Sequence, residues 1–210
     1  MYCNYIYFNI FLCFIIFFVT IKMLNKNILN LKGNLLMAMP DIGDQRFTES
    51  VIFICEHNKH GAMGLVINST KSELKFENIL DELNIHKEPQ KKIDIQSGGP
   101  VESARGFILH SNDYKIDSTI IITEHIYLTA SVDIIKDIAN DKGPQNIRFT
   151  LGYTGWEPGQ LEREIQENTW LHTSADHTLV FSSNTDQIWK NSVKTIGINI
   201  SHFNHTPGHA

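Results

Sequence analysis

Short runs of β-branched and other apolar residues alternate with amphipathic segments along residues 29–210, and this alternation restricts the chain to a mixture of strands and helices. The runs SVIFIC (50–55) and MGLVIN (63–68) are separated by the polar, glycine-containing segment EHNKHGA, which predicts two strands joined by a hairpin. Further strands are predicted over residues 93–96, 105–110, 118–123 and 146–153. The segments 105–110 and 118–123 are expected to pair with each other.

Apolar residues at helical spacing predict several helices between these strands. The predicted helices cover residues 76–83, 131–139, 160–168 and about 185–196. Ser131 is a suitable cap for the second of them, and Gly197 is expected to end the last. Because no repeat or long linker interrupts residues 29–210, the prediction is a single α+β domain.

Residues 1–28 differ in composition from the rest of the chain. Residues 1–21 carry no charged side chain, and their apolar core of about seventeen residues is at the short end for a membrane-spanning helix. Three interpretations stay open: a segment that is not translated, with the start at Met23 or near Leu29, a signal-anchor that leaves the domain in the cytoplasm, or a cleaved signal. We favour the first, and we expect membrane contact only if residues 1–28 are translated and insert.

The remaining 182 residues form an acidic chain with one thiol. They contain 16 Lys and Arg against 23 Asp and Glu, whereas nucleic-acid binding normally requires a concentrated positive patch. Direct binding to nucleic acid is therefore not expected. Since Cys55 is the only cysteine after residue 28, no disulfide can form within residues 29–210, which favours a cytoplasmic location.

Cys55, Glu56 and His57 are candidates for chemistry at the end of the first hairpin strand. If that strand continues through them, Cys55 and His57 share a face, and a Cys–His nucleophile is conceivable. The alternative is a buried thiol followed by solvated turn residues, including His60. No catalytic constellation, metal site or cofactor is predicted.

A second group of candidates could bind a small ligand. Gly98 and Gly99 end a strand and allow close approach of an anion, with Arg105 nearby as a partner for carboxylate or phosphate. Trp156 precedes a helix and could stack on a ligand. The alternatives are a structural turn for the glycines and packing of Trp156 on Leu161. The candidate ligand-binding residues are therefore Glu56, His57, Gly98, Gly99, Arg105 and Trp156.

The C-terminal tail contains three histidines at helical spacing, His202, His205 and His209. Pro207 argues against a helix there. Adventitious binding of a transition metal is the expected behaviour of this tail, and no functional metal site is predicted.

Several long motifs give the chain a family resemblance. They are CEHNKHGAMGLVIN (55–68), SGGPVESARGFILH (97–110) and LGYTGWEPGQLEREIQENTWL (151–171), together with LMAMPD (36–41), FTESV (47–51) and the terminal GHA. In this order they resemble the YqgE/AlgH family of bacterial proteins over about residues 29–210. The resemblance implies an α+β fold with a mixed, largely antiparallel, partly barrel-like sheet surrounded by helices, and a natural start near Leu29. It implies no assigned activity, although many members are described as transcriptional regulators.

Three functional hypotheses follow. We favour a noncatalytic cytoplasmic protein that acts through a protein partner or self-association, with an indirect regulatory role. The second hypothesis is a small-ligand binder for an anionic or nucleotide-like molecule, which predicts that Gly98, Gly99, Arg105 and Trp156 converge on one pocket. The third is an enzyme with Cys55, Glu56 and His57 as nucleophilic or acid–base residues, which predicts that they lie within hydrogen-bonding reach of one another in a cleft.

Overall fold

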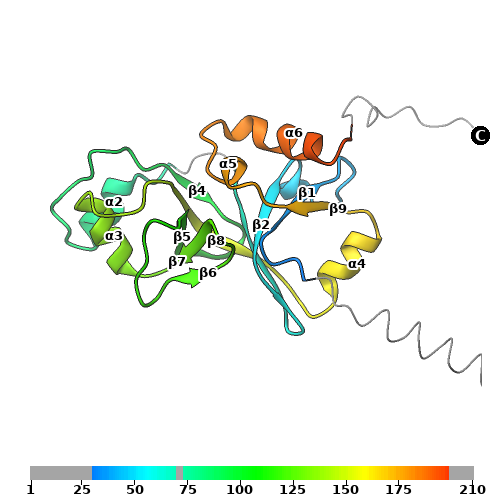
Figure 1. Ribbon diagram of the computed structural model, residues 1–210, viewed down its shortest axis with the longest axis horizontal. Helices are drawn as coiled ribbons and strands as arrows, with labels where there is room; N and C mark the ends of the chain where they lie inside the picture. The colour runs from blue at the N-terminus through cyan, green and yellow to red at the C-terminus, as the bar shows by residue number, and fades with distance from the viewer. Residues whose placement is uncertain (1–29, 70–72, 199–210) are drawn as a thin grey trace, which may run out of the picture. The chain divides into compact units, whose positions relative to one another are not determined.

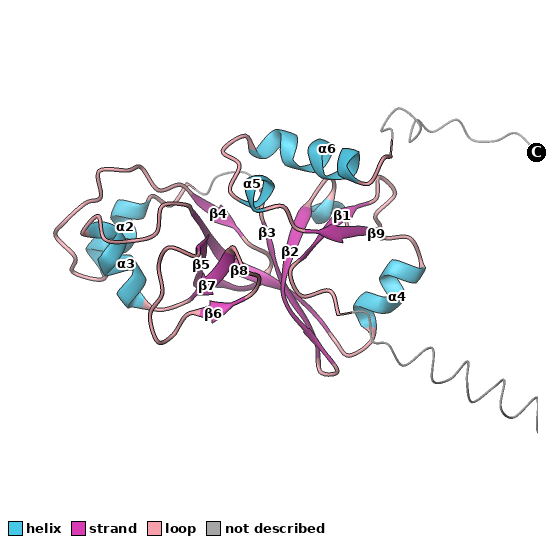
Figure 2. Cartoon of the chain, in the orientation of Figure 1, coloured by secondary structure: helices cyan, strands magenta, loops and turns pink. Residues whose placement is uncertain are grey.

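The computed structural model describes residues 30–69 and 73–198, and these form one curled sheet with helices packed around it (Figures 1 and 2). The strands are β1 (Asn34–Ala38), β2 (Val51–Asn58), β3 (Gly61–Val66), β4 (Ile95–Ser97), β5 (Val101–Ser111), β6 (Ile120–Ile121), β7 (Ile126–Thr129), β8 (Ile147–Trp156) and β9 (Trp170–Ser174). The helices are the 3-10 turn η1 (Gln45–Phe47), α2 (Phe76–Glu82), α3 (Val132–Ala139), α4 (Gln160–Gln166), α5 (His177–Val180) and α6 (Thr185–Thr195).

The sheet has the order β6-β7-β5-β8-β3-β2-β1-β9, with β4 added in parallel to β8 and every other pair antiparallel. The long strand β8 joins the two halves, because its first residues pair with β4 and β5 and its last residues pair with β3. It bends at Gly152, which has a φ of 72° and lies so close to Gly99 that a Cβ would be 2.5 Å from the Gly99 carbonyl oxygen. The bend curls the sheet into a half-barrel and confirms the predicted α+β class.

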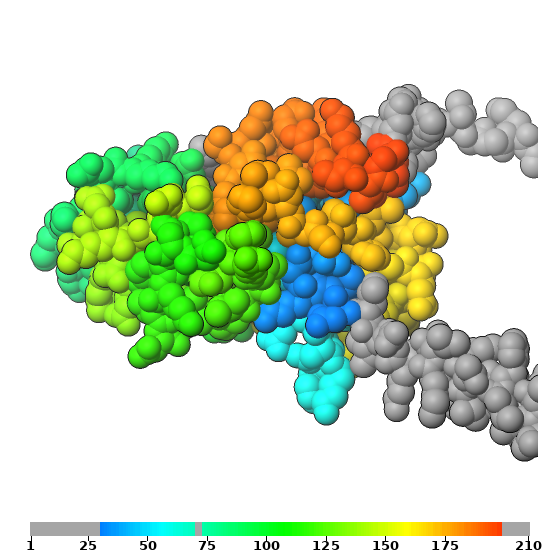
Figure 3. Space-filling model, viewed as in Figure 1, coloured from blue at the N-terminus to red at the C-terminus, as the bar shows by residue number. Residues whose placement is uncertain are grey.

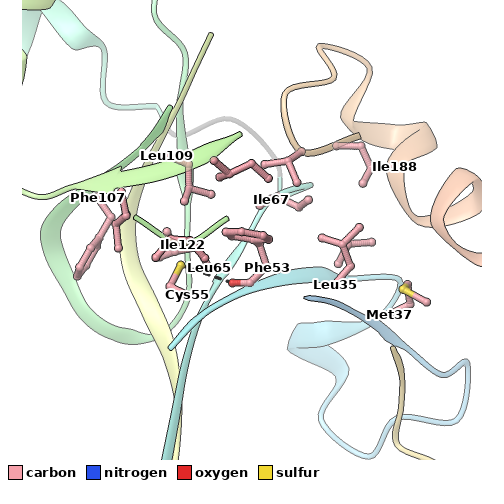
Figure 4. Packing of buried hydrophobic residues seen from close by; sticks show 14 of the residues in the cluster. Leu35, Met37, Phe53, Cys55, Leu65, Ile67, Phe107, Leu109, Ile122 and Ile188 are labelled. Atoms are coloured by element: carbon pink, nitrogen blue, oxygen red, sulfur yellow. Dashed lines mark hydrogen bonds between the residues drawn. The ribbon is translucent and has the colours of Figure 1, made fainter. Parts of the chain in front are cut away.

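The main core lies inside this curl (Figure 4). Leu35 and Phe53 from one half of the sheet meet Phe107 and Leu109 from the other, and all four side chains are buried. Ile188 and other residues of α5 and α6 close the open side. Burial of this apolar surface is the main driving force that holds the two halves together.

Two smaller clusters cover the outer faces of the sheet. One packs α4 against β1 and β2 and includes Trp156, Leu161 and Trp170. The other packs α2 and α3 against β4, β5 and β8, with Phe76 and Phe149 in edge-to-face contact at 6.0 Å. Each helix therefore buries the apolar face that its periodicity predicts.

The predicted helices are confirmed with small shifts at their ends. The helix predicted over residues 160–168 ends earlier, at Gln166. The last helix ends at Thr195, and Gly197 follows it with a positive φ of 75°. The first hairpin is also confirmed, although its strands extend further into the turn segment and meet at the pair Asn58 and Gly61.

The predicted direct pairing of segments 105–110 and 118–123 is wrong. β7 lies between them and pairs with β5 on one side and with β6 on the other. Sequence reasoning missed β7, whose four residues follow the polar pair Glu124 and His125, because so short an apolar run is a weak strand signal. It also missed β1, β9 and the single-turn helix α5.

No helix in the part of the chain that the structure describes is long and apolar enough to cross a membrane. The apolar segment that the sequence singles out, residues 1–28, lies outside the described residues. The three tail histidines, His202, His205 and His209, also lie outside them.

Candidate functional site

A cleft of about 1000 Å³ opens where the β2–β3 hairpin, β5 and the end of β8 approach one another. The hairpin turn projects at this place (Figures 1 and 3). The lining residues, which define the cleft from here on, include Glu56, Asn58, His60, Met63, Arg105, Phe107, Ile120, Leu128, Ala130, Tyr153, Trp156 and Glu157. Its size and its mixture of apolar walls with a few polar groups are typical of binding sites.

A β-bulge in β2 decides which candidate residues reach this cleft. Ile54 pairs with Gly64 and Glu56 pairs with Met63, so Cys55 is an extra residue in the ladder. Cys55 joins the main core inside the curl and Glu56 lines the cleft. His57 contacts Leu31 and Glu162, which belong to the outer face covered by α4. The bulge therefore separates Cys55 and His57 onto opposite faces, against the expectation from a continuous strand.

Cys55 is a core residue. It is 2% exposed, and its thiol donates a long hydrogen bond of 3.7 Å to the Phe53 carbonyl oxygen (Figure 4). Burial raises the pKa of the Cys55 thiol well above its usual range. A thiol that is neutral and inaccessible is not a nucleophile.

His57 is held in one tautomer. Its side chain is 1% exposed, Nδ1 accepts a hydrogen bond of 3.0 Å from the Leu31 amide, and Nε2 lies 3.2 Å from Glu162 Oε1. Because an amide can only donate, the proton of the neutral ring is on Nε2 and is donated to the carboxylate. His57 thus ties β2 to the start of the described chain and to α4.

Arg105 lies in the wall of the cleft and is already engaged. Its guanidinium donates to Glu102 Oε2 at 3.0 Å and is 5.0 Å from the centre of the Phe107 ring. The other oxygen of Glu102 accepts a hydrogen bond of 3.3 Å from the Tyr153 hydroxyl. Desolvation and the Glu102 charge raise the pKa of Tyr153.

Trp156 forms a fixed wall. It is 7% exposed and lies in the same cluster as Leu161. Its Nε1 donates to Glu164 Oε2 at 2.8 Å, and the same oxygen accepts from Trp170 Nε1 at 2.8 Å. The two indole rings meet edge to face at 6.2 Å. An indole held by these contacts borders the cleft and is not free to close over it.

Gly98 and Gly99 lie away from the cleft. The Gly98 amide donates to the Leu151 carbonyl at 2.7 Å, and the Gly98 carbonyl accepts from the Val66 amide at 2.9 Å. A Cβ at Gly98 would lie 2.3 Å from the Gly152 carbonyl oxygen, so this position requires glycine for close packing of the backbone. Gly99 lines a separate hollow of about 510 Å³. The structure therefore brings together Glu56, Arg105 and Trp156, and leaves His57, Gly98 and Gly99 elsewhere.

Sequence reasoning missed several residues that shape the cleft, among them Met63, Phe107, Tyr153 and Glu157. The alternation of Arg105 with Phe107 was the available signal, since residues two apart on a strand share a face. Within the residues that the structure describes, no group of three or more His, Cys, Asp or Glu side chains could hold a metal ion.

Comparisons with known proteins place these features in a family. The family model described as AlgH-like (DUF179) matches residues 35–201. A UPF0301 protein of Bradyrhizobium diazoefficiens is 42% identical over 189 residues, which cover 86% of this chain and 88% of that protein. A UPF0301 protein of Cereibacter sphaeroides is 42% identical over 184 residues, which cover 87% of this chain and 100% of the relative.

Two solved structures are similar to this one. The solution structure of the AlgH protein from Pseudomonas aeruginosa has a TM-score of 0.71 and 37% identity, and the match covers 88% of this chain and 98% of that one. The crystal structure of a protein from Corynebacterium diphtheriae has a TM-score of 0.67 and 18% identity, with 83% and 91% covered. The second match supports the fold alone.

Proposed function

The chain belongs to the AlgH-like family, and we propose that it is a noncatalytic protein that acts in the cytoplasm by binding a partner protein at the cleft. Any regulatory effect is then indirect, through that partner. We also propose that residues 29–210 form the working domain and that residues 1–28 lie outside it. The acidic composition after residue 28 supports a protein partner over nucleic acid, and the single buried thiol of residues 29–210 supports the cytoplasmic location.

The observation that carries the proposal is the exposed apolar surface beside Arg105. Ile120 lines the cleft and is 54% exposed, the highest value among the large apolar side chains of the described chain. Val132 is 42% exposed and lies on the other side of Arg105. Exposed apolar side chains that gather at a concave surface mark interaction sites.

The separation of the reactive side chains also supports a noncatalytic role. Cys55 is buried inside the curl, His57 is bonded on the outer face, and Glu56 alone of the three reaches the cleft. A nucleophile and its base must lie within hydrogen-bonding reach of each other, and these side chains lie on different faces of the sheet.

Site-specific photocrosslinking tests the proposal. A photoreactive phenylalanine analogue replaces Ile120 in the full chain expressed in living bacterial cells, and the same analogue at exposed Lys142 is the control. We expect one protein adduct of defined mass at position 120 and none at position 142. Identical adducts at both positions, or none at position 120, would contradict binding at the cleft.

A small ligand in the same cleft is the second candidate function, because Glu56, Arg105 and Trp156 converge there. A ligand that binds only the folded protein raises its melting temperature. Melting curves with nucleotides, flavins and divalent metals distinguish the two functions. A rise that the substitution Arg105→Gln removes favours the small ligand, and a flat response across the panel favours the partner protein.

A further inference from the structure

Strand β5 has an open edge next to the cleft. It runs from Val101 to Ser111, but β7 pairs only with its end, from Ile108 onward. On the side of β7, no strand of the described chain pairs with residues 105–107. An open strand edge presents unpaired backbone N–H and C=O groups, which can bind another extended chain.

Hollows lie on both faces of this edge. Arg105 and Phe107 point to the cleft, whereas Gly106 and Ile108 line a notch of about 140 Å³ together with Val132. Arg105 borders both hollows. The Phe149 ring packs against Gly106, where a Cβ would lie 2.9 Å from its Cε2, and it forms part of the wall of the notch. This alternation matches what an added strand needs, because its successive side chains point to opposite faces.

The charges around the cleft favour a basic occupant. Glu56 and Glu157 line it and are exposed, while the guanidinium of Arg105 is already bonded to Glu102. His60 and Tyr153 are the other ionisable side chains of the lining. Beyond residue 28 the whole chain is acidic, with 16 basic against 23 acidic residues, which favours encounter with a basic partner.

Building on the proposed function, we propose that the partner docks as an extended segment that adds a strand to β5 along residues 105–107. The added strand lies beside β5 on the same edge as β7, beyond the end of β7 at Thr129. Its side chain opposite Phe107 is Lys or Arg and enters the cleft. The side chain opposite Gly106 is small and apolar and enters the notch.

The test uses a synthetic peptide of sequence Ser-Ser-Thr-Val-Lys-Val-Thr-Ser-Ser, acetylated and amidated, titrated into the full chain labelled with ¹⁵N. We expect chemical-shift changes at the amides of Arg105, Gly106 and Phe107. Slowed hydrogen exchange is expected only where the N–H points to the open edge, because the N–H groups of successive residues point to opposite edges of a strand. N-methylation of alternate peptide amides gives two forms, one blocked on each edge of the strand. One form is expected to lose at least about tenfold in affinity and the other to bind as before, because a single edge meets β5.

Charge variants test the chemistry of the occupant. The double substitution Glu56→Gln with Glu157→Gln is expected to weaken binding of the lysine peptide about fivefold, and to leave a peptide with serine in place of lysine unaffected. The matched control is Glu88→Gln, which removes an exposed carboxylate outside both hollows. Equal loss with Glu88→Gln would remove the charge argument.

Three outcomes overturn strand addition. The first is an equal effect of both N-methylated forms, which indicates docking by side chains alone. The second is no perturbation at residues 105–107. The third is self-association through β5 without peptide, seen by sedimentation, which makes a second copy of the chain the occupant. A protein adduct at position 120 together with any of these retains the proposed function and removes only the strand addition, whereas absence of the adduct contradicts the proposed function itself.

Discussion

Replacing Arg148 with methionine is expected to destabilise the fold strongly, because this buried side chain links the sheet to the C-terminal helices by hydrogen bonds. Arg148 lies on β8 and is 7% exposed. Its Nε donates to the Val180 carbonyl at 2.6 Å and Nη2 donates to the Ser182 carbonyl at 2.6 Å. Nη1 donates to Gln96 Oε1, which completes the planar arrangement of donors.

The magnitude follows from two opposing effects. Each buried acceptor that loses its partner costs about 2 kcal/mol, so the three acceptors together cost about 6 kcal/mol. Burial lowers the pKa of Arg148 from 12.5 to about 10, so removal of the buried cation stabilises the folded state by about 3 kcal/mol. The expected net loss for Arg148→Met is therefore about 3 kcal/mol.

Urea unfolding of the parent protein and the variants measures this loss. Arg148→Lys is expected to be destabilised at least as much as Arg148→Met, because lysine keeps the buried charge without the planar set of donors. Arg163→Met is the control, since Arg163 is exposed on α4. If the free energy of unfolding of Arg148→Met lies within about 0.5 kcal/mol of that of the parent, the stabilising role of these hydrogen bonds is refuted.

Three further predictions concern buried groups. Burial lowers the pKa of His110, whose neutral ring donates through Nδ1 to a backbone carbonyl, so the unfolded chain takes up a proton first as the pH falls. The free energy of unfolding should therefore fall as the pH drops through about 6.5 and level off below the folded-state pKa of His110. The variant His110→Gln should reduce this pH dependence, whereas the control His125→Gln, at an exposed position, should keep it. Cys55 should resist alkylation at pH 8 in the native protein and react in urea, as mass spectrometry of its peptide will show; rapid native labelling would contradict its burial. Gly98→Ala should lower the free energy of unfolding in urea by about 1–3 kcal/mol, because its Cβ would contact the backbone. The control Gly43→Ala, with no atom within 4 Å of its new Cβ, should be neutral. An unchanged Gly98→Ala variant would restore this glycine as a candidate for ligand binding.

The helices were predictable because their signals are local. The spacing of Ile134, Ile135 and Ile138 identifies the buried face of α3, and Gly197 marks the end of α6. Strand pairing depends on residues distant in sequence. β9 has the sequence WLHTS, in which only Trp170 is fully buried, and its strand character comes from pairing with β1.

The candidate site shows a sharper limit of sequence reasoning. The segment from Val51 to Asn58 contains no glycine or proline, so nothing local indicates that its ladder is interrupted. The bulge is visible only in the register with β3, where Met63 faces Glu56 and leaves Cys55 unpaired. Because one extra residue reverses the face of everything after it, His57 moves away from Cys55 and Glu56 becomes a cleft residue. A functional argument from two-residue spacing on a strand therefore holds only when the partner strand is known. Here the register with β3 makes Cys55 a core thiol, His57 a structural histidine and Glu56 an exposed carboxylate at the cleft.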